Sequence, residues 1–304
     1  MNCKIIVIML LLAGDLVSCS SSEKKPPSRA EYRQRIEQWH ARRAESLRQE
    51  DSWLSLAGLY KIAAGRHTIG ADSSHDIVFP PEAARHIGTI TRNDTVFTFR
   101  SGPETSVTWN GEKVTEKTLL TDNPGRPTVL AQDSFFWYVI ERRGDYYLRL
   151  KNRNHPAFRF FNGIDHFPIS RDWRVKARFQ FFEEPRTLSI PDVLGNVYQD
   201  SLYGMLNFTL NGKPFRLAPL GNPRTDNQLF IILGDKTNGK TTYGGGRYLY
   251  IAPPDAEGST YIDFNKAYNP PCVFTSFATC PLPPVRNRLP IPIQAGEKMV
   301  NLQN

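Results

Sequence analysis

From Ser52 onward the sequence consists of short segments of alternating apolar and polar residues, separated by turn residues. The segments "DTVFTFRSG" and "GMLNFTLNGKPFRLAP" show this pattern, and the second carries Asn211-Gly212 in its middle. An Asn-Gly pair between two such segments is typical of a β-hairpin with a two-residue turn. Frequent turns combined with many Phe and Tyr residues predict a mainly β protein.

The length of the chain, 304 residues, indicates more than one domain. Because this is long for a single β-sandwich, we predict two β domains. The segment "NRNHPAF", from Asn152 to Phe158, is the predicted boundary. The first β domain then covers residues 52–151, and the second, an antiparallel β barrel or sandwich, covers residues 155–304.

A single amphipathic helix is predicted ahead of these domains, over residues 28–50. Ser28 and Glu31 have the spacing of a capping box, in which each side chain binds the backbone N–H of the other residue. One stripe of this helix is apolar except for an arginine: Tyr32, Ile36, Trp39, Arg43 and Leu47. We expect the stripe, with Trp39, to pack on the β body of the protein; the alternative is that it lies on a membrane surface.

The first residues of the chain are typical of an export signal. Lys4 is followed by an apolar run, Ile5 to Ala13, which is too short to span a bilayer. The tetrapeptide Leu16-Val17-Ser18-Cys19 then resembles the bacterial lipobox, whose cysteine is lipidated and becomes the mature N-terminus. An ordinary cleaved signal with a coincidental cysteine is the alternative.

We therefore predict a lipoprotein signal peptide over residues 1–18, lipidation at Cys19 and a tether over residues 19–27. The expected location is the bacterial cell envelope, and Ser20 favours its outer membrane. The net charge is +8, and basic residues crowd the segment from Lys24 to Arg48. A basic segment beside a lipid anchor is attracted to anionic headgroups. Nucleic acid is not a predicted partner, because the chain carries an export signal and no helix-turn-helix or RNA-binding signature.

The segments "AGRHTIGADSSHDIVFPPEAARHIGTI" and "WNGEKV" give the first β domain a resemblance to the forkhead-associated domain, a phosphothreonine-binding sandwich. The ligand positions depart from that family. Its arginine after the Ile-Gly pair is Ala71 here, its serine aligns with Ala84 and its histidine with Ile87. Because a dianionic phosphate needs charge-assisted donors, the resemblance implies a related scaffold without phosphopeptide recognition.

From Asp235 on, the segments "DKTNGKTTYGGGRYLYIAPP" and "YIDFNKAYNPPCVFTSFATCPLPP" closely resemble the bacterial family known as domain of unknown function 1684. Earlier segments fit the same family, so the resemblance extends from about Trp53 to Lys298. It implies no activity, since the family has no established function. The residues of this region therefore have to be interpreted directly.

Polar side chains set among aromatic residues in this region are candidates for one binding cleft. A cleft of this composition suits a sugar or a small carboxylate. Turn chemistry around Gly239 and buried structural ion pairs are the alternatives. The candidate binding residues are Asp235, Thr237, Tyr243, Arg247, Asp263, Asn265, Tyr268 and Arg288.

The proline-rich segment from Asn269 to Pro284, here called the strap, contains Cys272 and Cys280. In an oxidising compartment a disulfide is the first expectation. Free thiols are the alternative, because the resembling family includes members without export signals. The histidines show no metal-ligand spacing, and neither a metal nor a cofactor is predicted. We expect the strap to cross one mouth of the second β domain, above a polar floor of Arg247, Asp263 and Asn265.

The predicted function is that of a binding or assembly module displayed at a membrane, with a small molecule, saccharide or protein as its ligand. No Ser-His-Asp constellation is visible, and the carboxylates are too scattered for a glycosidase pair to be chosen. A hydrolase acting on an envelope saccharide or ester, with its site in the second β domain, is the alternative. An enclosed cleft with a carboxylate pair or an activated nucleophile would favour the hydrolase.

Overall fold

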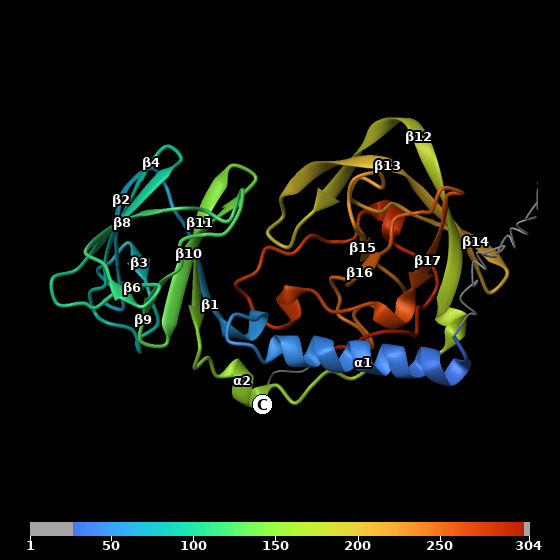
Figure 1. Ribbon diagram of the computed structural model, residues 1–304, viewed down its shortest axis with the longest axis horizontal. Helices are drawn as coiled ribbons and strands as arrows, with labels where there is room; N and C mark the ends of the chain where they lie inside the picture. The colour runs from blue at the N-terminus through green and yellow to red at the C-terminus, as the bar shows by residue number, and fades with distance from the viewer. Residues whose placement is uncertain (1–26, 301–304) are drawn as a thin grey trace, which may run out of the picture.

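A computed structural model describes residues 27–300, which form two β domains side by side with one long helix under the second (Figure 1). The fold is mainly β, as the turn-rich sequence predicts. The predicted signal peptide, Cys19 and nearly all of the tether lie outside the described residues. No helix among the described residues is long and apolar enough to cross a membrane.

The first β domain consists of two sheets with the core between them. The six-stranded sheet has the order β1–β11–β10–β9–β6–β7, and the five-stranded sheet has the order β3–β2–β4–β5–β8. Trp137 from one sheet packs against Phe99 from the other, and both are fully buried. The domain is therefore a β-sandwich. Its strands are β1 (Leu56–Lys61), β2 (Gly65–Gly70), β3 (Ile77–Val78), β4 (Gly88–Asn93), β5 (Val96–Ser101), β6 (Thr108–Trp109), β7 (Glu112–Lys113), β8 (Glu116–Leu119), β9 (Leu130–Gln132), β10 (Phe135–Arg142) and β11 (Asp145–Asn152).

The second β domain combines a four-stranded antiparallel sheet, β14–β13–β12–β17, with the separate hairpin β15–β16. Apolar side chains of both, among them Leu206 and Leu249, form one core between the two layers. The remaining chain, from Phe264 to Val300, contains no strand and folds over this core. The strands are β12 (Arg174–Pro191), β13 (Val197–Leu210), β14 (Lys213–Leu217), β15 (Leu229–Leu233), β16 (Arg247–Ile251) and β17 (Ser259–Asp263).

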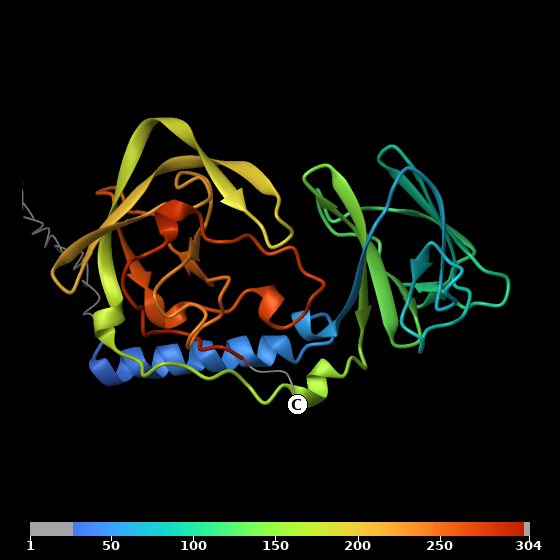
Figure 2. The same cartoon turned by 180° about the vertical axis from the view of Figure 1, so that it is seen from behind.

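Helical segments join and cover these sheets. The long helix is α1 (Arg29–Leu47), and α2 (Ala157–Phe160) follows the first β domain. The described residues also contain five short 3-10 helices: η1 (Trp53–Ser55), η2 (Arg171–Trp173), η3 (Phe264–Lys266), η4 (Pro271–Val273) and η5 (Val285–Asn287). Both views show the chain after α2 running back along α1 to reach β12 (Figures 1 and 2).

Two of the Asn-Gly pairs, Asn110-Gly111 and Asn211-Gly212, form hairpin turns, the second as the sequence predicts. Asn110 and Gly111 have φ angles of 51° and 83°, and Asn211 and Gly212 have φ angles of 50° and 72°. Two consecutive residues with positive φ are what a type I′ turn requires, and asparagine tolerates this conformation better than most residues. The second pair fixes the β13–β14 register, in which Leu210 lies opposite Lys213.

Helix α1 begins with the predicted capping box. Glu31 N–H donates to the Ser28 hydroxyl at 3.2 Å, and Ser28 N–H donates to the Glu31 carboxylate at 2.7 Å. The helix buries its stripe on the second β domain, where the Tyr32 hydroxyl donates to Asp263 at 2.8 Å. Tyr32, Ile36 and Leu47 of this stripe are buried against the protein and are not available to a membrane surface. Trp39 is half-buried, and the neighbouring His40 takes the more buried position.

The two domains also meet away from α1. Where the chain passes from α1 into the first β domain, Leu47 and Leu54 pack with Phe161 and with Phe274 of the strap in one apolar cluster. At the other contact, Arg143 at the tip of the β10–β11 hairpin lies over the Tyr198 ring, 3.0 Å from its centre.

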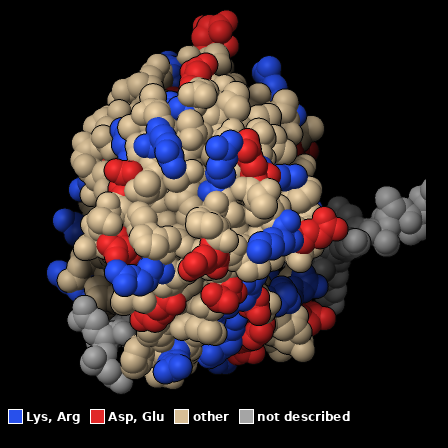
Figure 3. Space-filling model, turned by 90° about the vertical axis from the view of Figure 1, so that its left-hand side faces the viewer, with Lys and Arg blue, Asp and Glu red and all other residues tan. Residues whose placement is uncertain are grey.

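Figure 3 looks onto the outer side of the first β domain, where Lys and Arg are interspersed with Asp and Glu. This face therefore has no basic patch of the kind that binds a polyanion.

Candidate functional site

Asp235 and Arg247 form a buried ion pair at the end of the β15–β16 hairpin. The hairpin register places Arg247 opposite Leu233, two residues before Asp235. Arg247 Nη2 donates to Asp235 Oδ2 at 2.9 Å, and both side chains are 0% exposed. Burial lowers the pKa of Arg247, and the Asp235 carboxylate opposes this shift. The guanidinium also donates to three main-chain carbonyl oxygens, those of Ile293, Ala295 and Glu297.

The loop that follows Asp235 is closed by its own side chains. Asp235 Oδ1 accepts hydrogen bonds from Thr237 N–H at 2.8 Å and from Ile293 N–H at 3.1 Å. Asn238 Oδ1 accepts from Asp235 N–H at 2.6 Å, and the Thr237 and Thr242 hydroxyls lie 2.8 Å apart. Asp235, Thr237 and Asn238 therefore perform turn chemistry, and they hold the loop rigidly.

Beside this loop the surface has a hollow of about 370 Å³. One wall is the loop and the glycine run Gly244-Gly245-Gly246, and the other is the end of the strap with the chain after it. Its lining residues are Gly234, Asp235, Lys236, Asn238, Gly244, Gly245, Leu282, Pro283, Arg288, Leu289 and Pro290.

The end of the strap packs against Gly246, next to the hollow. This glycine has φ +85°, and a Cβ atom there would lie 2.5 Å from Pro283 Cγ and 2.6 Å from the Leu233 carbonyl oxygen. Only glycine combines this backbone conformation with such a close approach. The glycine run thus lets the strap form a wall of the hollow.

The hollow carries positive charge. Its one carboxylate, Asp235, is already paired with Arg247. Lys236 and Arg288 are exposed, and no ion pair among the described residues includes either of them. Leu282, Pro283, Leu289 and Pro290 supply apolar walls. This combination suits a small ligand that has an apolar body and an anionic group.

Asp263 and Asn265 do not share a floor with Arg247, contrary to the sequence-based expectation. They lie under α1, where Asp263 accepts from the Tyr32 hydroxyl and Asn265 Nδ2 donates to the Ser170 carbonyl at 2.8 Å. The reason is that the helix stripe needs polar partners where it crosses the end of β17. The helix is more than two hundred residues away in sequence, so spacing within the strap region could not reveal it.

The other predicted residues have different positions. Thr237 lies inside the loop and Tyr243 is half-buried beside Gly244, which lines the hollow. Tyr268 directly precedes the strap and does not line the hollow; its ring centre lies 5.9 Å from that of Tyr248. Of the eight candidates, Asp235 and Arg288 therefore line the hollow directly. Lys236, which also lines the hollow, is not among the predicted residues, although it lies between Asp235 and Thr237, which are.

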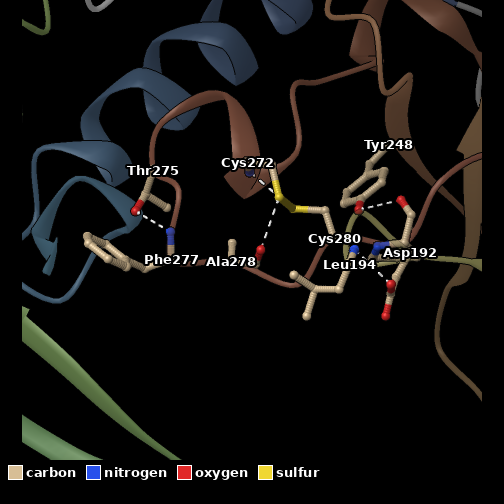
Figure 4. The surroundings of a disulfide bond; sticks show 9 residues. Asp192, Leu194, Tyr248, Cys272, Thr275, Phe277, Ala278 and Cys280 are labelled. Atoms are coloured by element: carbon tan, nitrogen blue, oxygen red, sulfur yellow. Dashed lines mark hydrogen bonds between the residues drawn. A yellow bond between two sulfur atoms is a disulfide. The ribbon is translucent and has the colours of Figure 1, made fainter. Parts of the chain in front are cut away.

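The strap is closed by a disulfide between Cys272 and Cys280, whose Cα atoms are 6.2 Å apart (Figure 4). Closing a ring of this size contributes roughly 2–3 kcal/mol in the chain-entropy model. The closed part does not cover Arg247. It lies between the domains, where Cys280 and Pro281 share a cavity with Trp53, and the Tyr248 hydroxyl donates to the Pro281 carbonyl at 2.9 Å.

A buried cluster under the end of α1 was also missed. Glu297 is 0% exposed, and its carboxylate accepts from Asn269 N–H at 2.7 Å and lies 3.4 Å from Arg43 Nε. His40 and His166 stack nearby with ring centres 3.6 Å apart. Arg43 belongs to the predicted helix stripe, and a lone cation on an apolar stripe is a signal for a buried acidic partner.

Residues 159–298 match the model of a family described as a protein of unknown function (DUF1684). This confirms the family resemblance for the second β domain, including the hollow and both strap cysteines. A search of the curated proteins finds no match. Among solved structures, the chain is similar to the uncharacterized protein from gene locus rrnAC0354 of Haloarcula marismortui, determined by solution NMR. The identity is 30%, over 45% of this chain and 77% of that one, with a TM-score of 0.38.

The family match does not include the segment from Trp53 to residue 158, so the resemblance is established over a shorter range than expected. The first β domain is a sandwich, as predicted, but its resemblance to the forkhead-associated domain stays a prediction.

Proposed function

We propose that this protein is a lipid-anchored envelope module whose second β domain binds a small carboxylate in the hollow. The observation that carries this proposal is the pair of cationic side chains, Lys236 and Arg288, which flank an apolar-walled hollow without acidic partners in the described chain. A carboxylate ligand would supply the missing anionic partner and place its apolar part against Leu289 and Pro290.

Binding is favoured over hydrolysis by the chemistry of the lining. Hydrolysis of an ester or a saccharide needs an activated nucleophile or a pair of carboxyl groups. The residues that line the hollow include no histidine and no cysteine, and their one carboxylate is held by Arg247. A ligand can be held there by charge and by apolar contact, with no group placed to attack it.

Removing both cations is expected to weaken carboxylate binding strongly. We expect benzoate and hexanoate to bind the parent. In the Lys236→Met/Arg288→Met variant we expect their Kd to rise by roughly a hundredfold, because each lost charged hydrogen bond contributes about 1.5–3 kcal/mol. Ligand-observed NMR with each acid and its uncharged amide measures this. Lys213→Met is the matched control, because it removes an exposed lysine from the β13–β14 hairpin. Equal binding of acid and amide, or equal binding by the variant, would contradict the proposal; turnover of an ester analogue would favour the hydrolase.

The lipid anchor is tested separately at Cys19. We expect Cys19→Ala to lose incorporation of a fatty acid analogue and to move from the membrane fraction to the soluble fraction. The reason is that one thioether-linked diacyl group and one amide-linked chain provide the apolar area that a stable anchor needs. Ser20→Ala is the control, since it leaves the modified thiol in place. A Cys19→Ala protein that stays labelled and membrane-bound would refute the anchor without affecting the ligand proposal.

A further inference from the structure

A second cavity, of about 170 Å³, lies between the two β domains. The first β domain and η1 contribute one side of it, and the disulfide-closed strap with Tyr248 contributes the other. The residues that line it are Trp53, Leu56, Arg142, Arg149, Tyr248, Pro271, Ala278, Thr279, Cys280 and Pro281. It shares no lining residue with the hollow.

Arg149 is the unusual member of this lining. It belongs to β11, whose neighbours Leu148 and Leu150 point into the sandwich core, so its own side chain leaves the opposite face of the sheet toward the second domain. Its Nε atom is buried and has no hydrogen-bond partner in the described part of the chain. No acidic side chain of residues 27–300 forms an ion pair with it.

Tyr138 and Asp122, the two groups that favour the charged form of Arg149, do not neutralise it. Tyr138 is close, but burial raises the pKa of its hydroxyl, so this phenol is neutral at ordinary pH. Asp122 is the nearby carboxylate, and it is occupied: its Oδ2 accepts from Arg142 Nη1 at 2.8 Å and its Oδ1 accepts from Glu141 N–H at 2.9 Å. Two guanidinium groups therefore face one carboxylate.

A partly buried cation without a partner is costly, because the charge loses water and gains no compensating contact. An apolar residue at this position would avoid the cost, so the cation needs an anion that residues 27–300 do not supply. We propose that the interdomain cavity binds a small oxyanion, either a phosphate or a carboxylate group, held by Arg149 with Arg142 beside it.

The cavity has the size and walls for such a group. A water molecule occupies about 30 Å³ in the liquid, so the volume accommodates one oxyanion with a few waters but no macromolecular segment. The disulfide fixes the strap wall, and the Tyr248 hydroxyl is committed to Pro281, which leaves the arginines as the charged donors. Trp53, Leu56 and the prolines supply the apolar part of the walls, and a charge-assisted hydrogen bond is stronger beside such groups than in water.

Titration of the full chain with inorganic phosphate, and separately with acetate, tests the proposal. Binding of phosphate alone assigns a phosphate site, and binding of acetate alone or of both assigns a carboxylate-compatible one. We expect Arg149→Met to raise the Kd for the anion at least about tenfold, because a charged hydrogen bond is lost. The anion-free variant is expected to melt at or above the temperature of the parent, since an uncompensated charge has been removed. Arg66→Met, an exposed arginine on β2, is the control and should bind normally.

Ala278→Leu gives a second, charge-neutral test, because Ala278 lines the cavity and a larger side chain there fills it. We expect this variant also to lose the anion, with both arginines intact. The proposal is overturned if the parent binds neither phosphate nor acetate, or if both variants bind as tightly as the parent. It is also overturned if Lys236→Met/Arg288→Met loses the anion while Arg149→Met keeps it, since the anion would then lie in the hollow.

Discussion

Replacing Asp235 by alanine is expected to reduce the free energy of unfolding by about 3–5 kcal/mol, the range found when one member of a buried ion pair is removed. The variant leaves Arg247 charged and 0% exposed, with only main-chain carbonyl oxygens to bind. It also removes the acceptor for Thr237 and Ile293, which holds the loop beside the hollow. Urea denaturation of parent and variant measures the loss.

Two further variants separate the buried charge from the turn. Asp255→Ala removes an exposed aspartate that also caps a turn, accepting from Ser259 N–H at 2.8 Å, and we expect a loss of about 1 kcal/mol. Asp235→Leu combined with Arg247→Met removes both charges and should recover most of the stability lost by Asp235→Ala. If the double variant is as unstable as the single one, the turn and not the uncompensated cation explains the effect.

The same ion pair illustrates how much of the site the sequence could predict. Asp235 and Arg247 are both candidate residues of a polar, glycine-rich segment, and a buried ion pair is the stated alternative to a binding cleft. The sequence could not predict which of the candidates pair. That burial depends on the chain from Ile293 to Glu297 closing over the hairpin, which is a contact between segments almost fifty residues apart. Periodicity and turn signals are local, so they predicted the strands, the hairpin turns and the capped helix.

Long-range pairings explain the remaining differences. Asp263 is a predicted ligand-binding residue because the sequence cannot show that its carboxylate already has a partner. That partner, Tyr32, lies at the other end of the chain. Lys236 and Arg288 approach one hollow only because the strap returns along Gly246. The disulfide is the exception: a nine-residue ring between prolines is local enough to be expected from the sequence.

The stability of Glu297→Gln relative to the parent is expected to increase by about 3 kcal/mol as the pH rises from about 4.5 to about 7. Burial raises the pKa of Glu297 from its ordinary 4.5 to about 7, although Arg43 and Asn269 oppose this shift. The folded parent therefore keeps the proton in a range where the unfolded chain has lost it. Stability from this group is complete below pH 4.5 and is lost as the pH rises through 7, at 1.36 kcal/mol for each unit of pKa difference. A glutamine cannot ionise, so the variant escapes this loss.

The measured quantity is the difference in unfolding free energy between the parent and Glu297→Gln. The parent's own pH profile is not enough, because His40 and His166 change its stability with pH in the opposite direction. Burial lowers the pKa of both, that of His166 to about 4, so these histidines destabilise the folded state as the pH falls below about 6.5. They are present in both proteins and cancel in the comparison, which isolates Glu297.

Arg43→Met provides the matched test. Removing this cation, 3.4 Å from the carboxylate, should raise the pKa of Glu297 further and move the loss to higher pH. Denaturation curves at half-unit steps from pH 4 to pH 9 give all three profiles. A difference between parent and Glu297→Gln that does not vary with pH would mean that Arg43 keeps Glu297 ionised throughout, as an ordinary buried ion pair.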